Sequence, residues 1–328
     1  MSESGPHIDE IAAIREQLAA NITFTPVVRC PAIESALGPG TEVLAKLEFL
    51  QRTGTFKARG ALATLMRLDS EQLKRGVTAV SAGNHAIATA FAAQSLGTTA
   101  KVVMIRSANP SRIASCRSYG AEVVLADDVL AAFEVAEQIQ EDEGRYLVHP
   151  FEGPAVALGT GTVGVEICEQ CGDFDTLVVP IGGGGLIGGI GNATKQLRPE
   201  CEIIGVEPTG ADTMHRSRAA GSPQHIDAVT TIADSLGAPF AMPYSFALTE
   251  TNVDRLVLVD DDMLRRCMGF LFQAMKIAVE PACAATTAAA LNPLRGELQG
   301  KRVVLLMCGS NIDWATFERE VKFDASVA

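Results

Sequence analysis

The chain has 328 residues, of which 47% are hydrophobic and 20% are charged, and its formal net charge is −12. It is long enough for two domains or one large α/β unit, and it is too apolar to be disordered. An isoelectric point of about 4.9 argues against a nucleic-acid surface or an anionic lipid surface, and no apolar run is long enough to cross a bilayer. We therefore expect a cytoplasmic protein that acts on a small molecule.

After an N-terminal helix over 8–20, short apolar strands alternate with amphipathic helices along the chain. Strands are predicted over 42–49, 77–80, 101–105, 122–125, 146–148, 176–180, 202–206, 255–259 and 302–307, with helices over 58–68, 84–96, 110–119, 129–142, 155–171, 186–197, 211–220 and 261–290. The intervening segment 221–251 carries three prolines and no clean periodicity, which favours loop and short helix. The alternation predicts an α/β fold with mainly parallel sheets.

The number of strands is too large for one small sheet, so we predict two domains. A small domain over 76–150 is inserted into a large domain made of residues 1–75 and 151–328. Each domain should hold a mainly parallel sheet flanked by helices.

Lys57 stands where a loop containing Gly54 enters the helix over 58–68. The positive end of the helix dipole disfavours a second positive charge, and Phe56 can shield the amine from water, so both features lower a lysine pKa. Such a lysine suits an imine-forming nucleophile or a base. The alternative is an exposed lysine in the first turn of a helix.

Four consecutive glycines, Gly182, Gly183, Gly184 and Gly185, follow the apolar strand over 176–180 and precede a helix. Bare amides and a helix N-terminus meet there, which predicts a phosphate site. A tight turn would need only one or two of these glycines. Two of them, with Gly188, also match a dinucleotide-binding fingerprint, so a nicotinamide cofactor is an open alternative.

A second strand-to-helix junction has the sequence Ser81-Ala82-Gly83-Asn84-His85. Ser81 is expected to cap the following helix, and the small residues leave its first amides bare. This predicts an anion pocket suited to a carboxylate. An ordinary helix cap is the alternative interpretation.

Together these stretches resemble the fold-type II pyridoxal-phosphate enzymes, and more narrowly the threonine/serine dehydratase and serine racemase group, which share the tryptophan synthase β-like fold. The matching motifs, in order along nearly the whole chain, are Lys46-Leu-Glu48, Thr55-Phe-Lys57-Ala-Arg-Gly60, Ser81-Ala-Gly-Asn-His85, Val148-His-Pro-Phe151, the glycines at 182–185, Val206-Glu-Pro208 and Cys308-Gly-Ser-Asn-Ile-Asp313.

The resemblance implies that Lys57 forms a Schiff base with pyridoxal 5'-phosphate, that Phe56 packs beside the cofactor and that Asn84 binds the pyridine 3'-oxygen. The glycines at 182–185 match the phosphate cradle, and Cys308 matches the residue that faces the pyridine nitrogen. A thiol is no carboxylate, so it should leave the ring a weaker electron sink, which favours loss of a β-substituent over transamination.

The implied reaction is the dehydration and deamination of a 3-hydroxy amino acid such as L-threonine or L-serine. The 81–85 loop holds the substrate carboxylate, and the Lys57 amine, freed when the substrate replaces it, removes the Cα proton. Loss of the β-hydroxyl gives an enamine that hydrolyses to a 2-keto acid and ammonium.

Several residues depart from the pattern of this group. Ala82 stands where racemases carry a second serine, which weakens the racemase alternative. Ile87, Thr160 and Ser235 replace residues common around the pocket, which suggests a bulkier substrate such as phenylserine. No arginine occurs at 131–132, where relatives acting on acidic substrates place one, and this weakens hydroxyaspartate.

The divalent-cation site of the group maps to Glu207, Ala211 and Thr213. Thr213 is not an acid, so the implied cation site is incomplete. The relatives are commonly dimers or tetramers, which implies a homodimer or homotetramer here. A non-catalytic binding module is a further alternative, which requires Lys57 to be inert.

Eight cysteines are scattered along the chain, which in a large cytosolic protein indicates reduced thiols packed in the core. Cys168 and Cys171 have the spacing of a redox or zinc motif, but no second pair completes a zinc site.

Overall fold

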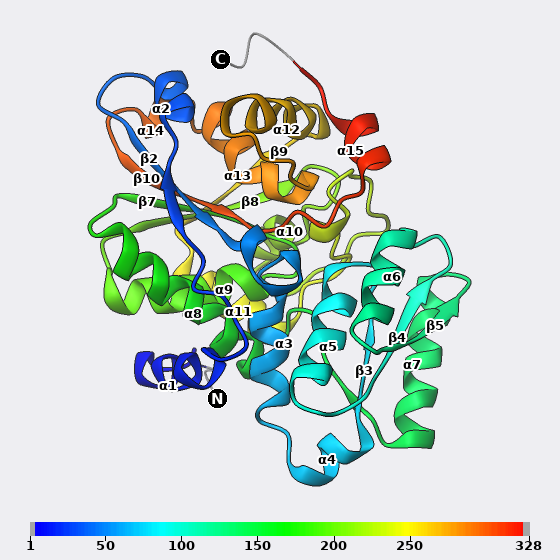
Figure 1. Ribbon diagram of the computed structural model, residues 1–328. Coiled ribbons are helices and arrows are strands. Elements are labelled where there is room, and N and C mark those ends of the chain that lie inside the picture. Colours follow the sequence, from blue (N-terminus) through cyan, green and yellow to red (C-terminus); the bar gives the residue numbers. More distant parts are fainter. Residues whose placement is uncertain (1–3, 324–328) are drawn as a thin grey trace.

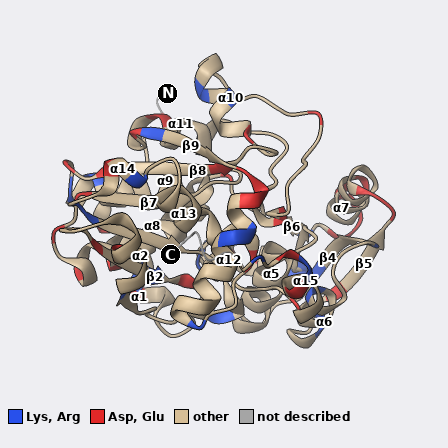
Figure 2. Ribbon diagram, turned by 90° about the horizontal axis from the view of Figure 1, so that it is seen from above, with Lys and Arg blue, Asp and Glu red and all other residues tan. Residues whose placement is uncertain are grey.

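The computed structural model describes residues 4–323 and has two sheets, each flanked by helices (Figure 1). Acidic and basic segments are interspersed along a mostly uncharged ribbon in Figure 2. Over the described range, no helix combines the length and apolar character that a membrane crossing requires. The predicted α/β class with two helix-flanked sheets is confirmed.

The large sheet has six strands in the order β1-β2-β10-β7-β8-β9. Its strands are β1 (Val27–Arg29), β2 (Glu42–Leu47), β7 (Thr176–Pro180), β8 (Glu202–Pro208), β9 (Arg255–Val259) and β10 (Arg302–Met307). All neighbours are parallel except β1 and β2. Every residue of β7 is buried, as expected for a central strand covered on both faces.

The small sheet is wholly parallel and has the order β5-β4-β3-β6. Its strands are β3 (Val77–Val80), β4 (Ala100–Ile105), β5 (Glu122–Ala126) and β6 (Tyr146–Leu147), connected by α5 (Asn84–Ser95), α6 (Pro110–Ser118) and α7 (Val129–Glu143). Asp128 caps the start of α7 by accepting a hydrogen bond from the Ala131 amide, and Gly144 ends this helix in the left-handed conformation.

The large sheet is enclosed by helices on both faces (Figure 1). On the lower side in this view, α8 (Pro154–Cys171) and α9 (Gly185–Leu197) pack against the sheet and α11 (Pro243–Asn252) packs on α9. On the upper side, α13 (Pro281–Leu291) packs against the sheet and α12 (Asp261–Met275) packs on α13. Helix α3 (Lys57–Leu65) contacts both α8 and α5, and so lies between the two sheets. The remaining helices are α1 (Ile8–Leu18), α2 (Pro31–Leu37), α4 (Ser70–Arg75), α10 (Thr213–Ala220), α14 (Arg295–Leu298) and α15 (Trp314–Glu320), with single 3-10 turns η1 (Glu48–Leu50), η2 (Arg52–Gly54) and η3 (Asp234–Leu236).

The predicted strands and long helices are present, but short elements were missed. Five short elements were not predicted, because three to seven residues carry too little periodicity to be recognised; these are β1, α2, α4, α14 and α15. The strand predicted over 42–49 ends at Leu47, where η1 begins. All strands of the small sheet come from 77–147, which agrees with an inserted unit, and the domain limits at 75 and 151 stay a prediction.

Candidate active site

Lys57 is the first residue of α3, as its local sequence predicts. Its Nζ donates a hydrogen bond of 2.5 Å to the Pro150 carbonyl and lies 5.1 Å from the centroid of the Phe56 ring. Burial lowers the pKa of this amine to about 8, although the nearby Cys308 and Glu280 act in the opposite direction. A large fraction of the amine is therefore neutral, and nucleophilic, near pH 8.

The glycine loop connects β7 to α9 and has no room for side chains. Gly184 is the N-cap of α9 and has a φ of 87°, a conformation that L residues rarely adopt. A Cβ at Gly183 would run into the Phe151 ring. One small cavity is bordered by this loop together with Phe56, Lys57, Asn84, Glu280 and Cys308.

Gly188 completes the dinucleotide fingerprint in sequence, but it lies inside α9. A Cβ at Gly188 would come within 3.1 Å of the Leu248 Cβ, so a glycine here lets α11 approach α9 closely. The packing of two helices therefore accounts for this glycine without a nucleotide.

Residues 81–83 connect β3 to α5, and Asn84 and His85 are the first two residues of that helix. We keep the name 81–85 loop for this stretch, whose cap differs from the prediction. The Ser81 hydroxyl accepts a 3.1 Å hydrogen bond from the Gly83 amide, which precedes the helix, and Gly83 itself is the N-cap with no side-chain bond. The prediction that Ser81 caps α5 is therefore wrong, because the serine closes a turn one step earlier. The first amides of α5 consequently have no side-chain acceptor from a cap residue.

The side chain of His85 is buried, and its contacts indicate which ring nitrogen carries the proton. Its Nε2 lies 2.7 Å from the Val148 carbonyl, so Nε2 carries the proton and donates it there. Burial, the nearby positive charge of Lys57 and the influence of His149 lower the pKa of His85 to about 3 despite that hydrogen bond. His85 is therefore neutral at pH 7.

Asn84 forms hydrogen bonds with three side chains. Two of these residues were not predicted as site residues, and the third, Ser235, was predicted near the pocket but not as a partner of Asn84. Its Nδ2 donates to the two carboxylate oxygens of Glu280 at 2.9 and 3.2 Å and to the Ser235 hydroxyl at 3.1 Å. Its Oδ1 accepts a 2.8 Å hydrogen bond from the Asn311 amide group. The amide of Asn84 is thus fixed in one orientation. Burial raises the pKa of Glu280 to about 6.

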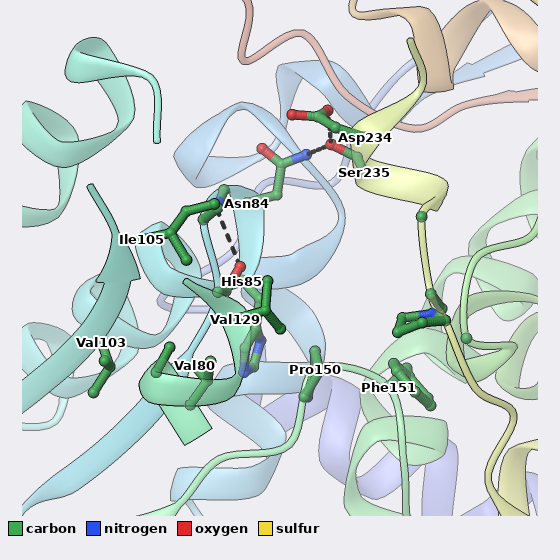
Figure 3. Close-up of a pocket in the computed structure, with 18 of the residues that line it drawn as sticks. Val80, Asn84, His85, Val103, Ile105, Val129, Pro150, Phe151, Asp234 and Ser235 are labelled. Carbon is green, nitrogen blue, oxygen red and sulfur yellow. Dashed lines mark hydrogen bonds between the residues drawn. The ribbon is translucent and has the colours of Figure 1, made fainter. Parts of the chain in front are cut away.

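A cavity of about 280 Å³ is lined by Lys57 and the 81–85 loop, whose Asn84 and His85 are labelled in Figure 3. Strands β3 and β4 and the start of α7 form an apolar wall, which we define as Val80, Val103, Ile105, Val129, Ala132 and Phe133. Pro239 and Phe240 also line the cavity, while Arg112, Asp234 and Ser235 add polar groups. Val129 and Phe133 are 55% and 41% exposed, respectively.

The residues expected to hold a divalent cation do not fit that role. The buried carboxylate of Glu207 accepts hydrogen bonds from the Met214 and His215 amides at 2.8 and 2.7 Å, at the start of α10. The Thr213 hydroxyl donates to the Ala238 carbonyl at 2.7 Å. Residues 4–323 contain no group of three or more His, Cys, Asp or Glu side chains placed to bind a metal.

All eight cysteines are buried and unpaired, which agrees with reduced core thiols. Cys168 and Cys171 lie in the last turn of α8 and belong to the core of the large sheet.

Comparison with known proteins gives consistent matches across the chain. The model of the family described as "Pyridoxal-phosphate dependent enzyme" matches residues 18–309. The chain is 52% identical to phenylserine dehydratase of Ralstonia pickettii over 316 residues, which cover 96% of both chains. It is 40% identical to L-threonine ammonia-lyase of Thermotoga maritima, with 85% of this chain and 70% of that one covered. The structure of maize serine racemase superposes with a TM-score of 0.91 at 33% identity, covering 96% of each chain.

Proposed function

The chain belongs to the family of pyridoxal-phosphate dependent enzymes, and from this premise we propose that it dehydrates 3-hydroxy amino acids with an aromatic β-substituent, such as phenylserine, to a 2-keto acid and ammonium. Several of its relatives are named as dehydratases or ammonia-lyases, others as serine racemases, and it is a PLP-dependent ammonia-lyase or dehydratase. The observation that supports the aromatic substrate is the apolar wall of the cavity beside Lys57.

The residues around the small cavity fit the cofactor. The amides of the glycine loop and the start of α9 would bind its phosphate, Asn84 its 3'-oxygen, and Cys308 would face its ring nitrogen. When bound, pyridoxal phosphate supplies an aldehyde carbon that amines attack and a ring that withdraws electrons from the substrate Cα.

Lys57 accounts for the proton transfer. Its Nζ, whose pKa burial lowers to about 8, would accept the proton from the substrate Cα. His85 is neutral and its Nε2 is engaged by the Val148 carbonyl, so we assign it a role in supporting the loop rather than in proton transfer.

The apolar wall favours an aromatic β-substituent over the methyl group of threonine or the hydrogen of serine. Ala132 lines the cavity at 131–132, so the arginine that relatives acting on acidic substrates are expected to place there is absent. Burying a phenyl ring against this wall stabilises binding by about 1.5–3 kcal/mol relative to leaving it in water. That difference predicts roughly 10- to 100-fold higher kcat/KM for phenylserine than for serine.

Two alternatives from the sequence are less well supported. The family match replaces the nicotinamide alternative with pyridoxal phosphate, and the fingerprint glycine at 188 has a packing role. Ala82 lines the cavity and has no hydroxyl to act as the second acid that a racemase needs. Assembly as a homodimer or homotetramer and a cytoplasmic location stay predictions, and light scattering would measure the assembly.

The proposal is tested with a panel of threo-phenylserine, threonine, serine and 3-hydroxyaspartate, following keto acid and ammonium release. We expect phenylserine to have the highest kcat/KM. The variants Val129→Ala and Phe133→Ala should each lower its kcat/KM roughly 3- to 10-fold and change that of threonine far less, because only the aryl group reaches those side chains. Equal turnover of serine and phenylserine would refute the aromatic assignment, and a coloured enzyme that releases no keto acid from any of them would refute the reaction.

A further inference from the structure

Arg112, in α6, places a guanidinium in the wall of the cavity beside the 81–85 loop. Its side chain is buried, with the residue only 8% exposed, and an ideal Cβ at Gly83 would lie 3.0 Å from its Nη1. Among the described residues that line the cavity, only Arg112 and Lys57 are lysine or arginine. Lys57 is committed to the cofactor in the proposed function. Arg112 is then the remaining lysine or arginine among the described residues that line the cavity.

The guanidinium is held by two separate sets of contacts. Its Nε donates to the Asn311 carbonyl at 3.2 Å, which fixes the base of the group. Its Nη1 and Nη2 donate to the two carboxylate oxygens of Asp234 at 2.5 and 3.3 Å. The Asp234 side chain is 59% exposed, so water can solvate this carboxylate when it leaves. The contact to Asn311 does not depend on Asp234.

Burial by itself would lower the pKa of Arg112, but Asp234, through a hydrogen bond and its charge, and the charges of Glu280 and Asp313 raise it above the ordinary value. The Glu280 carboxylate lies 4.0 Å from Nη2, on the side of the cofactor cavity. A buried guanidinium that stays charged needs an anion next to it. Replacing one carboxylate with another keeps that balance.

We propose that Arg112 is a substrate-binding residue, and that it exchanges the Asp234 carboxylate for the α-carboxylate of the incoming amino acid. A planar guanidinium binds a carboxylate through two parallel hydrogen bonds, and the pair it now makes with Asp234 has that form. The substrate carboxylate would lie between this fork and the first amides of α5, which follow Gly83. The proposal rests on the proposed function, because it assumes that the cavity receives an amino acid.

A purely structural role gives a different expectation. Arg112 also connects the helices of the small sheet to η3 and to the loop after β10. If it only joined these segments, its loss would weaken every ligand of the cavity to the same extent.

The test compares two probes that differ only in the carboxylate and cannot react with the cofactor, 3-phenylpropionate and 3-phenylpropan-1-ol, by calorimetric titration of the holoenzyme. In Arg112→Gln we expect the acid to bind about 10- to 100-fold more weakly, since a charge-assisted pair is lost, and the alcohol to bind as in the wild type. In Asp234→Asn we expect the acid to bind several-fold more tightly, because the competing carboxylate is gone. Arg106→Gln is the matched control, since Arg106 directly follows β4, is exposed and pairs with Asp127.

Equal weakening of both probes in Arg112→Gln, unchanged binding of the acid, or weaker binding of the acid in Asp234→Asn would each overturn the proposal. If Arg112→Gln does not fold, Asp234→Asn decides alone, because it keeps the arginine. Failure of the proposed function is separate. If no keto acid forms from the substrate panel, the proposed function fails, but the difference in binding between the acid and the alcohol can still be measured. If Arg112 does not bind the substrate, Arg112→Gln should form keto acid with the KM of the wild type.

Discussion

At the scale of single residues, the site depends on an amine whose pKa is lowered by burial. The Lys57 side chain is closed in by Phe56 and the Pro150 carbonyl, and burial moves its pKa from 10.5 to about 8. The position of Lys57 at a loop-to-helix junction can be recognised in the sequence. The burial that lowers its pKa also involves Pro150, which lies 93 positions away along the chain.

The pKa of Lys57 predicts how the apoprotein captures its cofactor. Only the neutral amine attacks an aldehyde, so lowering the pKa moves the onset of reaction to lower pH. The initial rate of Schiff-base formation, followed by its absorbance after mixing apoprotein with pyridoxal phosphate, should rise with pH and reach its midpoint at about 8. Lys57→Ala should give no band. A midpoint close to 10.5 would contradict a buried amine.

At the scale of elements, the turn between β8 and α10 shows how this chain differs from the cation-binding pattern it resembles. Burial raises the pKa of Glu207 to about 8, while the Met214 and His215 amides stabilise its charged form and Asp212 disfavours it. Both carboxylate oxygens of Glu207 accept hydrogen bonds from backbone amides in the first turn of α10. Thr213 stands where a cation site would need a second carboxylate, and its hydroxyl donates to the Ala238 carbonyl.

We therefore expect the enzyme to be independent of divalent cations. Treatment with a chelator should leave its activity and melting temperature unchanged. Thr213→Asp supplies the missing carboxylate, and this variant should show a melting temperature that rises when magnesium or calcium is added. A chelator-induced loss of stability in the wild type, restored by a divalent ion, would show that Glu207 binds a cation after all.

At the scale of the whole molecule, a buried cluster of charges joins segments that are distant in sequence. Lys46, Glu48, Arg59 and Glu166 come from β2, η1, α3 and α8, and each is at most 1% exposed. Arg59 donates to both carboxylates, and Lys46 donates to Glu166 at 2.6 Å. Two positive and two negative charges balance, and the cluster fixes α3 two residues after Lys57.

Removing one member should be costly, because it leaves buried charge without a partner. We expect Glu166→Ala to lower the free energy of unfolding by about 3–5 kcal/mol, measured by urea denaturation. The matched control is Asp127→Ala, which removes the exposed partner of Arg106 and should cost at most about 1 kcal/mol. A loss below that of the control would mean that the cluster adds nothing to stability.

The sequence by itself determined the fold class, and it predicted residues that border one cavity in the structure. Alternating strands and helices, the glycine loop, the lysine at a helix start and the asparagine loop are local patterns, and the structure brings the corresponding residues to one cavity. Local patterns suffice here because strand ends and helix starts in parallel sheets meet at the same edge.

Only the tertiary structure decided which side chains complete the site. Asn84 and Glu280 are 196 positions apart, and Arg112 and Asp234 are 122 apart, and neither pair has a local signature. Periodicity shows which face of a helix or strand is buried, but not which other element packs against that face. The arrangement of the two sheets relative to each other therefore came only from the tertiary structure. The structure also had to show that Ser81 accepts a hydrogen bond from the Gly83 amide and that Gly83, not Ser81, is the N-cap of α5.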